Sequence, residues 1–221
     1  MLIKTLLNRC YPVKGFIYGK VILNNTRITV KVKERKGSQG LCFRCKKAAP
    51  TYDHLKERRF RFIPLWGYIV MLAYKPRRVS CPEHGVTVEH IPWAHGKSSI
   101  CEPFRIFLSH WAKYLSWLEV ARQFRVSWKN VFESVEHVVE YGLKHRNLDT
   151  ISAIGIDEIQ YLKGHKYLTL VYQIDSACKR LLFIGPNRSA KTLLRFFIDF
   201  GKERSGQLKA ICSDLWKPYL K

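Results

Sequence analysis

The sequence predicts a multidomain α+β protein, because three stretches of the chain carry three different patterns. Paired Cys and His residues punctuate the first part, helical periodicity fills the middle part, and apolar runs separated by turns fill the last part. The chain has 221 residues, enough for one large domain or several small ones. Apolar residues make up 47% of it, which is enough for packed cores and argues against general disorder.

The charge balance is strongly basic, with 39 Lys and Arg against 17 Asp and Glu and a formal net charge of +22. Ordinary metabolic enzymes do not need such an excess. It indicates a polyanionic partner, most commonly nucleic acid, with a membrane surface as the alternative.

The membrane alternative has little support in the sequence. The longest apolar stretch, residues 62–74, contains Pro64 and Gly67 and is too short to span a bilayer. The N-terminus has no apolar block or cleavage site of a secretory signal. We therefore expect no membrane partner and a cytoplasmic, reducing environment, in which the seven cysteines are metal ligands or buried thiols.

A basic hairpin is predicted for residues 16–35, within an N-terminal region of residues 1–40. Asn24-Asn25 supplies the turn, and the second strand alternates polar and apolar residues, as a strand with one solvated face does. The apolar positions are Ile28, Val30 and Val32. A solvated strand face explains the basic side chains here better than a specific contact does.

Two ligand pairs, each with two intervening residues, predict a zinc-binding domain over residues 41–100. One short turn of this kind aims two ligands at one ion, so two turns complete a tetrahedral site with three thiolates and one imidazole. The predicted ligands are Cys42, Cys45, Cys81 and His84. His54 lies between the two pairs and is an alternative fourth ligand. The Zn²⁺ would be structural, because it holds a small domain that lacks a large core.

The other four cysteines have no partner at ligand spacing, so packed thiols are expected there. They are Cys10, Cys101, Cys178 and Cys212.

Helical periodicity predicts three helices in residues 101–148. The first covers residues 103–115, the second covers residues 118–124, and the third begins after Ser127 and ends near Gly142. Ser127 is placed to cap the third helix, and a short helix, a tight turn and a capped longer helix have the layout of a helix-turn-helix. The expected apolar faces are Phe104, Phe107, Leu108, Trp111 and Leu115 on the first helix, and Val131, Phe132, Val135, Val138 and Val139 on the third.

The start of the third helix would then enter a DNA groove, with basic side chains beside the phosphates. The predicted DNA-binding residues are Arg122, Arg125, Ser127, Lys129 and Asn130. Three acids further along the helix would repel the backbone: Glu133, Glu136 and Glu140. A plain helical hairpin with a polar face is the alternative interpretation of this region.

The last third predicts three antiparallel strands, a crossover helix and a fourth strand parallel to the first. The expected strands are residues 153–159, 166–174, 180–184 and 209–214, and the helix is capped by Ser189 and ends near Gly201. Its expected inward residues are Leu193, Leu194, Phe197 and Ile198.

Two acids fall on the strands that this topology pairs. Asp157 lies inside the first strand and Asp214 at the end of the fourth, so the pairing puts them side by side. Adjacent carboxylates repel and are costly within strands, whereas divalent cations relieve both penalties and support phosphoryl transfer. This order of elements with these acids is that of the ribonuclease H-like fold. As structural alternatives, Asp157 would pair with a lysine and Asp214 would cap a short helix.

Taken together, these stretches resemble the ISL3 family of bacterial insertion-sequence transposases of the Asp-Asp-Glu class. The resemblance covers nearly all of residues 42–221. It is carried by CFRC, RRVSCPEHGVTVEHIPWAHGKS, WAKYLSWLEVARQFRVSWKNVFESVEHVVEYGLKHR, IGIDEIQYLKGHKYLTLVYQID and SDLWKPYLK.

The resemblance implies a zinc domain, a helix-turn-helix that binds the element's DNA ends, and, over residues 149–221, the first half of a ribonuclease H-like catalytic core. Asp157 and Asp214 would be the first two ligands of Mg²⁺ or Mn²⁺ in strand cleavage and strand transfer. Two departures stand out. His84 replaces a frequent cysteine, and the sequence ends at Lys221, before the family's third acid.

We therefore expect a C-terminally truncated bacterial transposase with little or no activity, associated with the nucleoid when bound to DNA and able to form homo-oligomers through an open sheet edge. One alternative is a non-catalytic DNA-binding repressor of transposition. Another is a zinc-ribbon module whose basic surface binds RNA or a protein.

Overall fold

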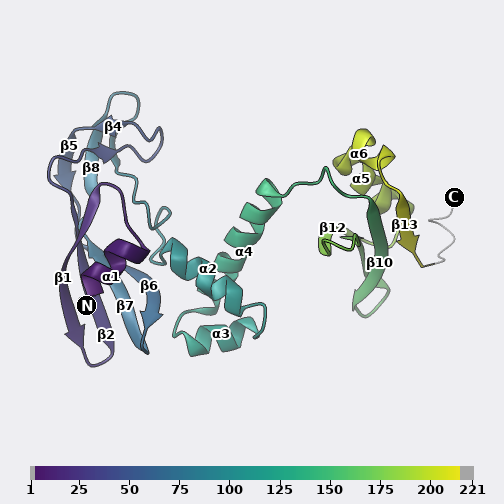
Figure 1. Cartoon of the computed structure of the whole chain (residues 1–221), viewed down its shortest axis with the longest axis horizontal. Coiled ribbons are helices and arrows are strands. Elements are labelled where there is room, and N and C mark those ends of the chain that lie inside the picture. The colour runs from purple at the N-terminus through teal and green to yellow at the C-terminus, as the bar shows by residue number, and fades with distance from the viewer. Residues whose placement is uncertain (1–2, 215–221) are drawn as a thin grey trace. The chain divides into compact units, whose positions relative to one another are not determined.

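The computed structural model describes residues 3–214, which belong to two units (Figure 1). The N-terminal unit comprises residues 1–144 and the C-terminal unit residues 145–221. The described residues contain six helices and four sheets, so the mixed α+β class predicted from the sequence is confirmed.

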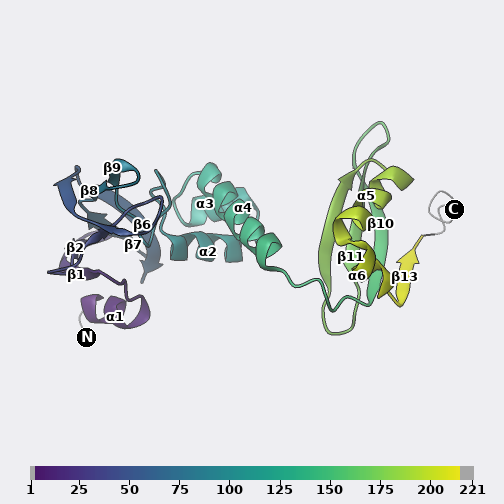
Figure 2. The ribbon, with the colours of Figure 1, turned by 90° about the horizontal axis from the view of Figure 1, so that it is seen from above.

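A four-stranded sheet forms the main core of the N-terminal unit. Its strands run in the order β1-β2-β7-β6, and helix α1 packs beside it (Figure 2). These elements are α1 (Ile3–Cys10), β1 (Phe16–Asn24), β2 (Arg27–Glu34), β6 (Arg58–Leu65) and β7 (Tyr68–Tyr74). The predicted hairpin is confirmed, since β1 and β2 pair antiparallel and Ile28, Val30 and Val32 are buried. Trp93 packs edge-on against Phe16 and is fully buried in this core.

Two smaller sheets adjoin this core. One pairs β3 with β4, and the other has the order β5-β8-β9. Their strands are β3 (Gly40–Leu41), β4 (Ala48–Ala49), β5 (Thr51–His54), β8 (Arg77–Cys81) and β9 (Gly85–Val88). Val79 and Ala49 pack here in a small cluster with the cysteines, so little apolar area holds these short strands together.

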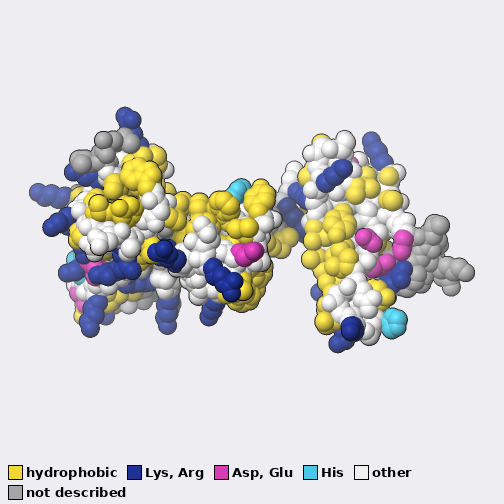
Figure 3. Space-filling view, turned by 90° about the horizontal axis from the view of Figure 1, so that it is seen from below, with side chains coloured by type: hydrophobic (Ala, Val, Ile, Leu, Met, Phe, Trp, Pro, Cys, Tyr) yellow, Lys and Arg dark blue, Asp and Glu magenta, His cyan; other side chains and the backbone are white. Residues whose placement is uncertain are grey.

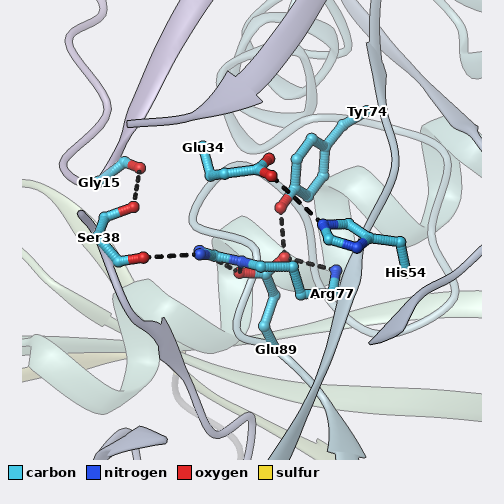
Figure 4. Close-up of polar contacts among 7 residues, drawn as sticks. All are labelled: Gly15, Glu34, Ser38, His54, Tyr74, Arg77 and Glu89. Atoms are coloured by element: carbon cyan, nitrogen blue, oxygen red, sulfur yellow. Dashed lines mark hydrogen bonds and ion pairs between the residues drawn. The ribbon is translucent and has the colours of Figure 1, made fainter. Parts of the chain in front are cut away.

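A buried ion pair ties the small sheets to the main one (Figure 4). The side chains of Arg77 and Glu89 are only 4% and 1% exposed, and Arg77 Nη2 lies 2.8 Å from Glu89 Oε2. The hydroxyl of Tyr74, on β7, donates to the same carboxylate. Arg77 also donates to the carbonyl oxygen of Ser38, in the segment before β3. The pair thus has its hydrogen bonds satisfied, which compensates the cost of burying two charges.

Three helices complete the N-terminal unit: α2 (Glu102–Trp111), α3 (Trp117–Gln123) and α4 (Trp128–His145). Phe104 and Leu108 of α2 and Val131 of α4 are buried as predicted. Four predicted core residues are exposed instead: Trp111, Leu115, Phe132 and Val139. Helix α2 ends at Trp111, four residues earlier than expected, and α4 turns a narrower face inward that includes Ser134.

The C-terminal unit has one four-stranded sheet in the order β12-β11-β10-β13. Strands β10, β11 and β12 pair antiparallel, and β13 pairs parallel to β10, as the sequence predicts. The elements are β10 (Ala153–Leu162), β11 (Lys166–Gln173), β12 (Arg180–Pro186), α5 (Ala190–Phe200), α6 (Lys202–Gly206) and β13 (Ala210–Ser213).

Helix α5 covers one face of this sheet, but through a different stripe from the predicted one (Figure 2). Leu194 and Ile198 are 59% and 70% exposed, so their prediction as inward residues is wrong. The buried residues of α5 are Thr192, Phe196 and Phe200. A small residue on the strand allows this approach, because a Cβ on Gly185 would lie 2.2 Å from Thr192 Cγ2.

The structure also tests two other predictions. Of the four cysteines expected to be packed thiols, Cys101 is buried and Cys178 is half-buried. The prediction is wrong for Cys10, at the end of α1, and for Cys212, on the edge strand β13, which are both exposed. Among residues 3–214, no helix combines the length and the apolar character that a membrane crossing needs.

Candidate functional site

Four predicted zinc ligands meet at the junction of the small sheets. The ligand atoms of Cys42, Cys45, Cys81 and His84 all lie within 4.8 Å of one another. The Sγ atoms of Cys45 and Cys81 are 3.7 Å apart, and Nδ1 of His84 lies 3.6 Å from Sγ of Cys81. A tetrahedral ion with Zn–S bonds of about 2.3 Å separates its sulfur ligands by about 3.8 Å. These separations therefore fit a tetrahedral metal ion such as Zn²⁺.

The backbone explains how each ligand pair forms its turn. The residue after each second ligand is left-handed, with φ of 61° at Lys46 and 65° at Gly85. This conformation reverses the chain, so the N–H of Lys46 donates to the carbonyl oxygen of Cys42. The N–H of Cys45 lowers the pKa of the Cys42 thiol, against the opposite effect of burial, and so favours the thiolate that a metal requires.

The alternative fourth ligand lies elsewhere. Nε2 of His54 is 3.3 Å from Oε1 of Glu34, in the network of Figure 4, whereas His84 lies with the three cysteines. The structure thus brings His84, and not His54, to the candidate zinc centre.

Helix α3 is capped at its start and is joined to α4 by a hydrogen-bonded turn. Ser116 and Glu119 form a capping box at the start of α3, and this signal can be read in the sequence. At its end, the N–H of Val126 donates to the carbonyl oxygen of Ala121, and Arg125 is left-handed with φ of 52°. Left-handed backbone costs a non-glycine residue about 1–2 kcal/mol, so this turn carries local strain.

Four of the predicted DNA-binding residues are exposed around this turn, namely Arg122, Arg125, Ser127 and Lys129, and Asn130 is half-buried. The hydroxyl of Ser127 accepts a hydrogen bond from the N–H of Asn130 at 3.1 Å, so the predicted cap is confirmed. Lys129 lies 3.8 Å from Glu133, one turn along the helix. The start of α4 is thus an ordered, basic helix end.

Arg61 and Arg27 of the main sheet lie near this turn, and the sequence pattern did not predict them as part of the interface. Arg61 of β6 donates to the carbonyl oxygen of Phe124 at 2.8 Å. Burial and the nearby charges of Arg27 and Arg125 lower the pKa of Arg61. No local signal could have found this group, because 63 residues separate Arg61 from Phe124. Figure 3 shows Lys and Arg side chains on many parts of the N-terminal unit.

The two predicted catalytic acids lie at the ends of paired segments of the C-terminal sheet. In the parallel register of β10 and β13, Ile156 pairs with Ser213, and Asp157 and Asp214 are the next residues of each segment. Asp157 is exposed, and its Oδ1 accepts a hydrogen bond from the N–H of Glu158 at 2.8 Å. The side chain of Asp214 is 55% exposed.

Arg188 forms ion pairs with both Asp214 and Glu158, the residue after Asp157. Arg188 Nη2 lies 3.3 Å from Asp214 Oδ2, and Arg188 Nε lies 3.3 Å from Glu158 Oε2. The Glu158 side chain is 5% exposed, in contrast to exposed Asp157, as alternation along the strand requires. The alternative that Asp214 caps a helix concerns residues 215–217, which lie outside the described residues.

Known proteins match both units. A transposase family model of the ISL3 type matches residues 154–221. The transposase of insertion sequence IS1557 from Mycobacterium tuberculosis is 32% identical over 196 residues, 86% of this chain. The chain is therefore similar to insertion-sequence transposases of the ISL3 type. The transposase of IS1001 from Bordetella parapertussis is 26% identical to this chain over 180 residues, 81% of its length.

These matches cover 43% of the IS1557 transposase and 44% of the IS1001 transposase, so the chain spans less than half of either relative. No solved structure matches it significantly.

Proposed function

We propose that this chain binds the DNA ends of an insertion sequence and provides the first part of a catalytic core for metal-dependent strand cleavage and strand transfer. The observation that carries the proposal is the parallel register of β10 and β13, which pairs Ile156 with Ser213, the residues directly before Asp157 and Asp214, in the unit that matches the transposase family model. A sheet of this strand order, with acids at these positions, supports a ribonuclease H-like core over residues 149–221.

Asp157 and Asp214 would hold Mg²⁺ or Mn²⁺. Carboxylate oxygens are the ligands that these hard cations prefer, and both side chains are exposed enough to admit a hydrated ion. When bound, the ion would supply an activated water or hydroxyl and stabilise the leaving oxygen. The protein's own contribution is to hold the two acids in register on adjacent strands.

The N-terminal unit would bind the DNA. We assign the helix-turn-helix to residues 101–148, with Arg122, Arg125, Ser127, Lys129 and Asn130 at the duplex, and a structural zinc domain to residues 41–100. The turn before α4 supports this, because Arg61 of the sheet donates to the Phe124 carbonyl there and lies near the charges of Arg27 and Arg125. Three neighbouring guanidinium groups repel one another, and a phosphate would relieve that repulsion. Residues 1–40 would support the sheet on which these arginines lie.

A non-catalytic repressor is the second candidate, and the Arg188–Asp214 ion pair favours it. The guanidinium engages a carboxylate that a metal would need, so the acids would be structural. Such a protein would occupy the element's ends without cutting them.

Mn²⁺ binding to this chain, followed by paramagnetic broadening, tests the two-acid site, and nicking of element-end DNA in Mg²⁺ or Mn²⁺ is measured with the core extended through a third acidic ligand. We expect Asp157→Asn and Asp214→Asn to abolish the broadening, and the nicking by the extended protein, while DNA affinity is retained. Asp199→Asn, at an exposed acid on α5, should change neither. Tight DNA binding without Mn²⁺ binding or nicking would identify the repressor. Equal nicking by both strand variants would refute the catalytic assignment.

A further inference from the structure

Three polar side chains from separate segments meet in the N-terminal unit, away from the cysteine cluster. His95 lies in the loop before α2, Glu102 is the first residue of α2, and His137 lies on α4. Nε2 of His137 is 2.6 Å from Glu102 Oε1, and Nε2 of His95 is 3.3 Å from Glu102 Oε2. One ligand atom from each residue lies within 4.8 Å of the others.

The backbone holds this arrangement without help from the three side chains. The N–H of Glu102 donates to the carbonyl oxygen of Trp93 at 2.9 Å, which folds the loop back on the start of α2. The N–H of Cys101 donates to the carbonyl oxygen of Arg61 on β6. Arg105 reaches the carbonyl oxygen of Glu133, one turn before His137 on α4. The two helices and the loop are thus pre-positioned, as a binding site requires.

One atom in the cluster has unused acceptor capacity. Oε2 of Glu102 is shielded from solvent and accepts no hydrogen bond with acceptable geometry from the described residues. Nε2 of His95 lies 3.3 Å from this oxygen without forming a hydrogen bond to it. The rings of His95 and His137 lie 5.4 Å apart with an angle of 40° between their planes, and each presents its Nε2 to the carboxylate. A buried acceptor left in this state is costly unless a donor or a cation satisfies it.

We propose that His95, Glu102 and His137 form a second metal site, for a divalent transition metal of the Zn²⁺ class. Two imidazoles and one carboxylate are a ligand set that such metals take, and three protein ligands leave room for water. In a tetrahedral site, bond lengths of about 2.0–2.2 Å place ligand atoms about 3.3–3.6 Å apart. The 3.3 Å contact between His95 and Glu102 already has this separation, and the 2.6 Å contact between His137 and Glu102 would widen by about 0.7–1 Å.

The bound metal would join α4 to the loop that follows the zinc-holding sheets. The first turn of α4, which carries Lys129, belongs to the candidate DNA interface. The metal would therefore fix the direction of this helix relative to the sheets of the N-terminal unit. This role goes beyond the proposed function and does not depend on it.

Metal stoichiometry of the purified full chain, measured with Zn²⁺ and then with Co²⁺, tests the site. Wild-type protein is expected to bind one equivalent more than His137→Gln, in which the amide still bonds Glu102. His95→Gln, at a side chain that is 59% exposed, is the second variant and is expected to lose the same equivalent. His110→Gln, an exposed histidine of α2, is the matched control and should bind as wild type does.

The Co²⁺ spectrum separates this site from the cysteine cluster. The thiolate-to-cobalt charge-transfer band should keep its intensity in His95→Gln and His137→Gln, because only nitrogen and oxygen ligands are removed. Circular dichroism confirms that each variant is folded. Equal stoichiometry in wild type and both variants would overturn the proposal, and so would a lost equivalent that carries the charge-transfer band.

Discussion

The Sγ atoms of Cys45 and Cys81 lie 3.7 Å apart, although 36 residues separate the two cysteines in the sequence. Two short strand pairs, β3-β4 and β8-β9, bring them together, and few apolar side chains support these strands. The stability of this part of the molecule therefore depends on what the four ligands bind.

Replacing one zinc ligand should unfold the small sheets. We expect Cys81→Ser to lose one equivalent of metal and the structure around residues 40–88, because metal binding supplies folding free energy to domains with little core. Hydrogen exchange of the backbone amides measures this locally. Cys212→Ser, at an exposed thiol of the other unit, is the control and should exchange as wild type does. Unchanged protection of residues 40–88 in Cys81→Ser would count against a structural zinc.

Removing the charge of Arg125 should separate DNA affinity from stability. Its φ of 52° suits glycine, so Arg125→Gly should raise stability by about 1 kcal/mol. DNA affinity should fall, and the slope of log affinity against log salt should become shallower by about one, the effect of a lost phosphate contact. Thermal unfolding and fluorescence anisotropy measure the two effects.

Lys46→Gly is the matched control for this change, because Lys46 is also basic and left-handed, with φ of 61°, but lies in the first zinc turn. Its salt slope should stay close to that of wild type. The same loss of affinity in both variants would mean that Arg125 contributes only general charge.

The buried Arg77–Glu89 pair should be sensitive to the loss of one partner. Glu89→Gln leaves the Arg77 guanidinium without its counter-charge in a buried position, and we expect a loss of about 3–5 kcal/mol in the free energy of unfolding. Urea denaturation measures it. Glu133→Gln breaks the exposed pair with Lys129 and should change stability by less than about 1 kcal/mol. A small loss in Glu89→Gln would mean that the carboxylate is not held as the structure has it.

Asp175 should make the stability of the C-terminal unit depend on pH. The Ser152 hydroxyl, and then Gln173, donate hydrogen bonds that lower the pKa of the Asp175 carboxyl below its ordinary value of 3.8. The folded state therefore favours the ionised form. The contribution of Asp175 to the free energy of unfolding is complete at pH values above 3.8. It is lost as the pH falls through the lower pKa that the carboxyl has in the folded state.

The comparison of wild type with Asp175→Asn across acidic pH measures this contribution. The difference in unfolding free energy should be constant near neutral pH and shrink below pH 4 or so. A difference that grows on acidification would contradict the direction of the pKa shift.

The sequence by itself predicted the first hairpin, the three middle helices and the elements of the last sheet, but not α1 or the individual strands β3 to β9. The spacing of Cys42 and its three partner residues predicted that they would come together as metal ligands. The lengths of β10, β11 and β12 and the short links between them predicted that these strands would pair antiparallel. The crossover helix predicted the parallel pairing of β10 and β13, whose last pair, Ile156 and Ser213, directly precedes Asp157 and Asp214. These features follow from local patterns and from the short range of chain connections, which a sequence records directly.

Tertiary structure alone decided which faces and distant residues meet. Leu194 and Ile198 of α5 satisfy a helical apolar pattern but are exposed, because the helix packs through Thr192 where Gly185 lets it approach the sheet. Arg61 reaches the turn before α4, and His95 and His137 reach Glu102, across long stretches of chain. Such contacts leave no periodic trace in the sequence, since they depend on how whole elements pack and not on the spacing of neighbouring residues.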